Sequence, residues 1–127
     1  MPATKWLMII GGAAGLVLPI FFAVMWTLAA VVNGHWVLGR DTLSELGGQV
    51  PSRWIFNVAV IVSGVLGIDF SFRLFVKFAD SRLGRAGSVV LAIASIGLVS
   101  VGVFPIDTGQ PHTIASVFFF TVVALSV

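Results

Sequence analysis

The sequence predicts an all-α fold, a polytopic transmembrane helical bundle with four spans. Of the 127 residues, 58% are hydrophobic and 9% are charged, whereas about 25% of the residues of an ordinary soluble domain are charged. Polar segments separate four apolar runs, at about residues 6–32, 54–76, 88–104 and 113–127. Because so few charges cannot cover a water-soluble surface, lipid is the expected solvent, and residues 1–127 are expected to form a single transmembrane domain.

Composition also excludes several classes of function. The net charge of +2 is a small excess of Lys and Arg, not a basic patch of the kind that binds nucleic acid. The chain has no Cys, which removes disulfides, thiolate metal sites and cysteine nucleophiles. The expected partners are therefore membrane lipids, other membrane subunits or a second copy of the chain, with no nucleic acid.

The first apolar run, residues 6–32, contains no charge and is long enough to cross about 30 Å of hydrocarbon. A secretory signal peptide is the less favoured alternative, because its apolar region would be only about 7 to 15 residues long. Pro19 lies inside the run and is expected to kink the helix, since it leaves the carbonyl of Gly15 without its helical donor.

The segment 33–53 is polar and reads as the first loop. Thr42 and Glu45 have the spacing of a capping box, so a short interfacial helix is expected here, with Leu43 and Leu46 turned toward lipid. Asp41 is interpreted as an N-cap in preference to a catalyst, because a carboxylate before a helix accepts orphan backbone N–H groups.

The remaining spans follow from shorter patterns. Trp54 is placed as an interfacial anchor of the second span, and residues 77–87 form a basic turn. The third span contains several glycines and serines and is expected to pack inside the bundle. After the loop 105–112, the last run is short of a full crossing, so either that helix is stunted or the chain is a C-terminally truncated form of a longer protein.

Orientation follows from the positive-inside rule. Basic residues gather at the second loop, and one more precedes the first span: Arg73, Lys77, Arg82, Arg85 and Lys5. We therefore expect a multi-pass protein of the cell membrane whose N-terminus and loop 77–87 are cytoplasmic. The loops 33–53 and 105–112 are then extracytoplasmic.

This topology brings most of the polar chemistry to one membrane face. Histidines and carboxylates there can hold a metal, or act as base and acid on a lipid head group. The candidates for catalysis are His112, Asp107, Asp41 and Ser44. Those for ligand binding are His35, Arg40, Glu45 and Arg53, and those for metal ligation are His35, Asp107 and His112. The alternative for His112 is a helix cap or a hydrogen bond to Ser116 one turn later, and Ser44 lacks a nucleophile-elbow context.

Asp69 is the one carboxylate inside a predicted span. Arg73 follows four residues later on the same helical face, which is an ion-pair spacing. Intramembrane ionisable groups are candidates for proton or ion relays. A structural pair is favoured, because Asp69 lies near the cytoplasmic boundary, where Arg73 can reach the head groups.

Two stretches carry a resemblance to a known family: Asp41-Thr42-Leu43-Ser44-Glu45-Leu46-Gly47, and Gly102-Val103-Phe104-Pro105 through Gly109 and His112. Together with the helix spacing, they resemble the prokaryotic multi-pass membrane proteins gathered as domain of unknown function 998. The resemblance covers nearly the whole chain and implies about six spans, of which these are the first four. It points to Ser44, Gly47 and His112, and it implies no established activity.

The expected function is the binding or transport of a small or lipidic ligand through a polar, extracytoplasmic-facing pocket, or support of a membrane complex. No cofactor is expected in that case, and an enzymatic reaction is the less favoured reading. The alternative is a metal-assisted lipid hydrolase that uses zinc with His112, Asp107 and Asp41. This alternative rests on analogy, since the chain lacks the paired-histidine helical motif of membrane-embedded zinc hydrolases.

Overall fold

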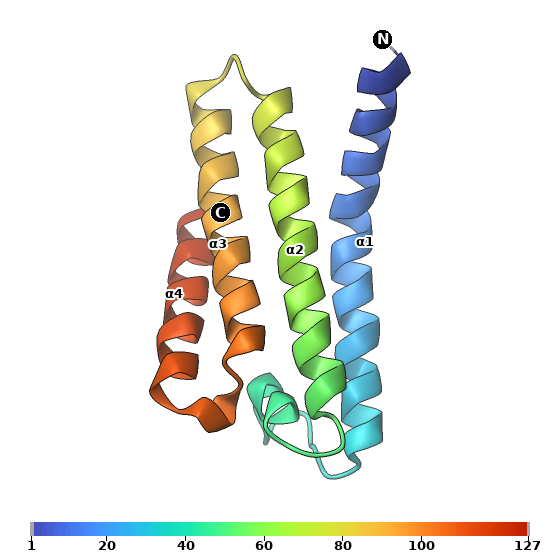
Figure 1. Ribbon diagram of the computed structural model, residues 1–127, viewed down its shortest axis with the longest axis vertical. Coiled ribbons are helices and arrows are strands. Elements are labelled where there is room, and N and C mark those ends of the chain that lie inside the picture. Colours follow the sequence, from blue (N-terminus) through green and yellow to red (C-terminus); the bar gives the residue numbers. More distant parts are fainter. Residues whose placement is uncertain (1, 127) are drawn as a thin grey trace.

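The computed structural model describes residues 2–126, which form four α-helices and two short 3-10 helices (Figure 1). In chain order these are α1 (Pro2–Asn33), η1 (Leu43–Gly47), α2 (Arg53–Lys77), α3 (Arg82–Val103), η2 (Ile106–Thr108) and α4 (Gln110–Ser126). None of the described residues lies in a strand. The predicted all-α fold is confirmed.

Three helical segments are long and apolar enough to cross a membrane: Gly12–Asn33, Arg53–Lys77 and Arg82–Val103. The fourth helix has 17 residues and is therefore about 26 Å long, somewhat less than the ~30 Å hydrocarbon core. This agrees with the expected short last run, whose final residue, Val127, lies outside the described residues. The protein is a helical membrane protein.

The helices follow one another up and down in sequence order (Figure 1). The main contacts join α1 to α2, α2 to α3, and α3 to α4, so α3 is an inner helix, as its composition predicts. Its N-terminus, however, is at Arg82 and not near residue 88, because the Ser81 hydroxyl caps the helix by accepting from the amide of Gly84 at 3.0 Å. The basic turn is therefore shorter than predicted.

Glycines permit the close approach of α2 and α3. A Cβ atom on Gly64 would lie 2.9 Å from both the carbonyl oxygen of Ser95 and the amide nitrogen of Val99. A Cβ atom on Gly102 would lie 2.9 Å from the carbonyl oxygen of Asn57. Because the neighbours are backbone atoms, they cannot move aside, and only glycine allows this spacing.

The outer helix α1 runs unbroken through Pro19, so the kink expected there stays a prediction. Only 6% of the most apolar stretch of α1 is buried within the protein, whereas 44% of the corresponding stretch of α2 is buried. Most of the surface of α1 is therefore available to lipid.

The hydrophobic core lies toward the end of the bundle that carries the first and third loops. Leu46 is fully buried in it, beside Ala29, Phe56 and Val60. The prediction that Leu46 turns toward lipid is therefore wrong. The reason is that Ser52 and Asn57 donate hydrogen bonds to the carbonyls of Leu46 and Gly47, at 2.8 and 2.9 Å, and hold η1 against the start of α2.

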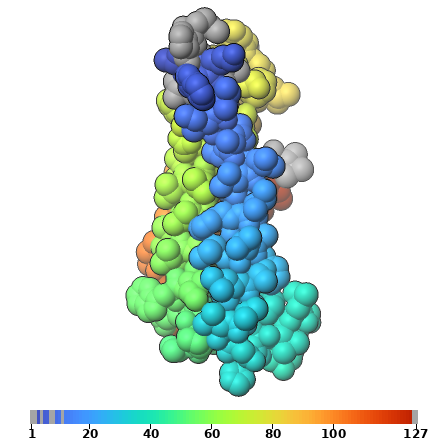
Figure 2. Space-filling view, turned by 90° about the vertical axis from the view of Figure 1, so that its right-hand side faces the viewer, coloured from blue at the N-terminus to red at the C-terminus, as the bar shows by residue number. Residues whose placement is uncertain are grey.

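The loops divide between the two ends of the molecule. The connections α1–α2 and α3–α4 lie together at one end, called here the loop end (Figure 1). The N-terminal part of α1 lies with the α2–α3 turn at the opposite end (Figure 2). This is the arrangement expected from alternating helix directions. Which end faces the cytoplasm remains a prediction.

Candidate functional site

Asn33, the last residue of α1, hydrogen-bonds several groups of the first loop. Its side-chain amide donates to Gln49 Oε1 and to Ser52 Oγ, both at 3.0 Å. Its carbonyl oxygen accepts from the backbone amides of His35 and Trp36, at 3.1 and 2.9 Å. Since Asn33 and Ser52 are buried, this network joins the end of α1 to the start of α2 through satisfied polar groups.

Asp41 stabilises a second turn of the same loop, at residues 37–41. One carboxylate oxygen accepts from the Val37 amide at 2.8 Å, and both oxygens accept from the Arg40 guanidinium at 2.9 and 3.0 Å. Arg40 also donates to the carbonyl of His35 at 3.0 Å. The hydrogen bond from Arg40 lowers the pKa of Asp41, and the Val37 amide acts in the same direction.

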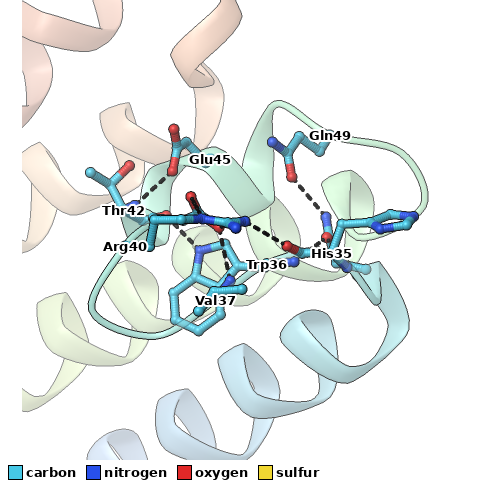
Figure 3. A network of polar contacts seen from close by, with 9 residues as sticks. His35, Trp36, Val37, Arg40, Thr42, Glu45 and Gln49 are labelled. Atoms are coloured by element: carbon cyan, nitrogen blue, oxygen red, sulfur yellow. Dashed lines mark hydrogen bonds and ion pairs between the residues drawn. The ribbon is translucent and has the colours of Figure 1, made fainter.

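Asp41 is not the N-cap that the sequence suggested. The short helix η1 is preceded by Thr42, whose amide donates to Glu45 Oε2 at 2.7 Å. The predicted pairing of Thr42 with Glu45 is thus present (Figure 3), while the Asp41 carboxylate accepts from the amide of Val37. Both acidic side chains are used to shape the loop.

Arg53 and Asp107 join the first helix hairpin to the third loop. Arg53, the first residue of α2, donates from Nη1 to Asp107 Oδ2 at 2.6 Å. Asp107 lies in η2, which begins at Ile106. The Ile106 side chain packs closely on Gly48, where an added Cβ atom would lie 2.5 Å from Ile106 Cγ2. Two of the predicted site residues therefore meet, as an ion pair between the loops.

His112 is anchored by both of its ring nitrogens. Nδ1 lies 2.7 Å from the carbonyl oxygen of Phe104, just after the C-terminus of α3, and Nε2 lies 3.2 Å from Ser116 Oγ. Because a carbonyl only accepts, Nδ1 carries the proton in the neutral ring, and Nε2 accepts from the hydroxyl. The buried imidazole thus ties α4 to α3, and its pairing with Ser116 is the one that the spacing suggested.

The remaining candidates are not assembled into one centre. The side chains of His35 and Ser44 have no described hydrogen bond, and His35 is exposed. Within residues 2–126, no group of three His, Asp or Glu side chains is close enough to hold a metal ion. Zinc binding by His35, Asp107 and His112 therefore stays a prediction without a preformed cluster.

The intramembrane pair lies in the half of α2 nearer the opposite end. Arg73 Nε is 2.8 Å from Asp69 Oδ2, and Nη2 is 3.3 Å from Oδ1. Both side chains retain some exposure within the protein, 23% for Arg73 and 45% for Asp69. The two groups form the ion pair that their spacing suggested.

Apolar cavities open on the helical surface, including one between α3 and α4 and one between α2 and α3. The α3–α4 groove has a volume of about 390 Å³ and is lined by Ser100, Phe104, Pro111, Ile114, Ala115 and Phe118. The α2–α3 groove has a volume of about 250 Å³ and is lined by Ile68, Ser71, Phe72, Phe75, Ser88, Val89 and Ala92. Neither contains a residue of the first loop, so the polar pocket expected between the loops stays a prediction.

The sequence analysis did not predict that Asn33 and Ser52 hold the loop end together through buried hydrogen bonds. In the sequence, both are simply members of the polar segment 33–53. The available signal was weak: a lone amide ends a long apolar run, and a hydroxyl follows Pro51 just before the next run. Such residues join helix ends when they become buried, because their polar groups then need partners.

Comparison with known proteins gives a family profile and several relatives. The profile described as protein of unknown function (DUF998) matches residues 16–127. Proteins named "Putative peptide transport system permease protein" from Brucella suis biovar 1 (strain 1330) and Brucella abortus (strain 2308) are each 34% identical over 80 residues. These matches cover 62% of this chain and 26% of each relative, about a quarter of its length. No solved structure gives a significant match.

Proposed function

This chain belongs to the family described as protein of unknown function (DUF998), and from its α3–α4 groove we propose that it is a membrane-embedded binding protein for a lipidic ligand. The apolar part of the ligand occupies the α3–α4 groove, and its polar part lies at the loop end. This proposal keeps the expected class of ligand but moves its binding site from the space between the loops to an apolar surface.

The α3–α4 groove is the observation that carries the proposal. Its volume of about 390 Å³ is within the usual range of ligand sites, about 300 to 1,000 Å³. Phe104 and Phe118 contribute aromatic walls, and Ser100 is the one polar residue of this lining. A hydrocarbon chain fits this lining, whereas a polar ligand would lose its hydrogen bonds to water without replacement.

The loop end supplies the surroundings of the polar part. Phe104 and Pro111 line the groove and flank η2 in the sequence, where Asp107 is paired with Arg53. Because these two charges compensate each other, the local field is small. A neutral or zwitterionic head group therefore suits this end better than a strongly charged one.

Native mass spectrometry tests the proposal. The protein would be purified in mild detergent, and its retained lipids compared with those of Ser100→Phe, which fills the groove, and Val65→Phe, an exposed position of α2 outside both grooves. We expect the wild type and Val65→Phe to retain one lipid class that Ser100→Phe loses. Equal retention by a helical, monodisperse Ser100→Phe protein contradicts the proposal.

A second candidate is a membrane component of a transport system. It is supported by the relatives, which are named "Putative peptide transport system permease protein", although each match spans only part of the relative. The test is uptake of a radiolabelled tripeptide by producing cells and by a deletion strain. Loss of uptake that returns on complementation supports this role, and unchanged uptake contradicts it.

A further inference from the structure

We propose that the α2–α3 groove and the basic start of α3 together bind an anionic phospholipid. One acyl chain lies in the groove, and the phosphate group meets Arg82 and Arg85. This site lies at the opposite end of the molecule from the site of the proposed function, and it does not depend on that function.

The charged residues at this end are mostly basic. Lys77 ends α2 and Arg82 begins α3, and Arg85 follows one turn later. Asp80 is the one acidic residue of the intervening turn. Arg82 and Arg85 are exposed, and neither forms an ion pair with any described residue. Two guanidinium groups are thus available to an external anion.

The helix itself strengthens the attraction. The first turn of a helix carries about half a positive charge and usually favours acidic side chains. The first turn of α3 contains no acidic residue and begins with Arg82, and Arg85 lies three residues later. These arginines add to the positive end of the helix dipole. A phosphate group placed there is stabilised by the side chains and the dipole together.

Helical register joins the charges to the groove. Residues three, four and seven positions apart share one helical face. Arg82, Arg85, Val89 and Ala92 follow this spacing along α3, and the last two line the groove. This face of α3 is therefore basic near the α2–α3 turn and apolar farther along the helix. A membrane lipid has the same order, with its charged head group followed by its acyl chains.

The groove distinguishes a phospholipid from a free phosphate ion. Its lining is almost wholly apolar, and Phe72 and Phe75 of α2 face Val89 and Ala92 of α3 across it. Inorganic phosphate would engage the arginines alone and leave this surface unused. An anionic lipid uses both parts, and each basic residue near a membrane surface strengthens such binding by about fivefold.

The test is competition between lipids in vesicles. The full chain would be reconstituted in equimolar phosphatidylglycerol and phosphatidylcholine, extracted in mild detergent, and analysed for bound lipid by native mass spectrometry. We expect the wild type to retain phosphatidylglycerol selectively. The double variant Arg82→Ala/Arg85→Ala should lose about 25-fold of that preference, while Lys5→Ala, which removes an exposed charge from α1, should keep it.

A groove-filling variant separates a defined site from general surface attraction. Ala92→Phe retains both arginines but blocks the acyl chain, so it should also lose selective retention; Val89→Trp, at a more exposed position, serves if Ala92→Phe does not fold. The proposal would be overturned by the absence of a preference in the wild type, by an unchanged preference without the arginines, or by an unchanged preference with the groove filled. Displacement of the lipid by millimolar inorganic phosphate would overturn it in favour of a simple anion site.

Discussion

Arg53 and Asp107 are 54 positions apart in the sequence, yet their side chains meet at 2.6 Å. The pair ties the start of α2 to the short helix that connects α3 with α4. Through it, the two helix hairpins of the bundle are joined at the loop end by a direct polar contact.

Breaking this pair should have a modest effect on stability. Its side chains are 34% and 44% exposed, so solvent screens the charges, and a coupling of about 0.2–1 kcal/mol is expected. A double-mutant cycle with Arg53→Ala and Asp107→Ala, followed by detergent-induced unfolding, measures it. The coupling should shrink at high salt, and strictly additive single substitutions would show that the contact contributes nothing.

Asn33→Ala should be more damaging than either of those changes. The substitution removes the donor to the buried Ser52 oxygen, which still donates to the carbonyl of Leu46, and it leaves two partly buried backbone amides without an acceptor. An unsatisfied buried group costs about 1–3 kcal/mol. Unfolding free energies give the loss, and faster hydrogen exchange at the His35 and Trp36 amides locates it. Thr27→Ala is the control, because its hydroxyl bonds the carbonyl of Ala23 at an exposed position; a similar loss in both variants would contradict the role of Asn33.

Asp41 should make the first loop sensitive to acid. Arg40 lowers its pKa below the ordinary value of 3.8, so the folded loop favours the carboxylate. The resulting stabilisation is present above pH 3.8 and is lost as the pH falls through the lower, folded-state pKa. Carbon-13 NMR of the labelled carboxyl group in micelles measures this pKa directly. Arg40→Ala should raise it toward 3.8, and a pKa that does not respond would refute the assignment.

Features that depend on local sequence patterns could be predicted, whereas contacts between residues far apart in the sequence could not. Spans were predictable because a helix in lipid needs about 20 apolar residues, and the meeting of the two loops followed from alternating helix directions. The burial of Leu46 was not predictable, because an apolar side chain beside a membrane can face either lipid or protein. The partners of Asn33 and Arg53 depend on the tertiary path of the chain, which no local pattern reveals.

Glycine substitutions should separate helix packing from helix propensity. Gly64→Ala places a methyl group against the backbone of α3 and should destabilise the bundle by about 1–3 kcal/mol. Gly12→Ala meets no atom within 4 Å, and it should be neutral or stabilising by up to about 1 kcal/mol, since alanine favours the helix. Unfolding of the two variants in one detergent gives the comparison. Equal effects would show that α2 and α3 are not held at the close spacing that Gly64 permits.

Asp69→Asn distinguishes a structural ion pair from a relay within α2. As a pair of residues four apart on one helix, Asp69 and Arg73 are worth about 0.2–0.5 kcal/mol, and the long arginine side chain can extend to the head groups when the carboxylate is removed. We therefore expect an intact fold and a small loss of stability. Helicity and detergent-induced unfolding check this result, with Asp69→Glu as the charge-conserving control. If transport is established, a relay requires that Asp69→Asn abolish uptake while the fold persists, because the amide does not titrate; uptake at the wild-type rate would leave the pair with its structural role alone.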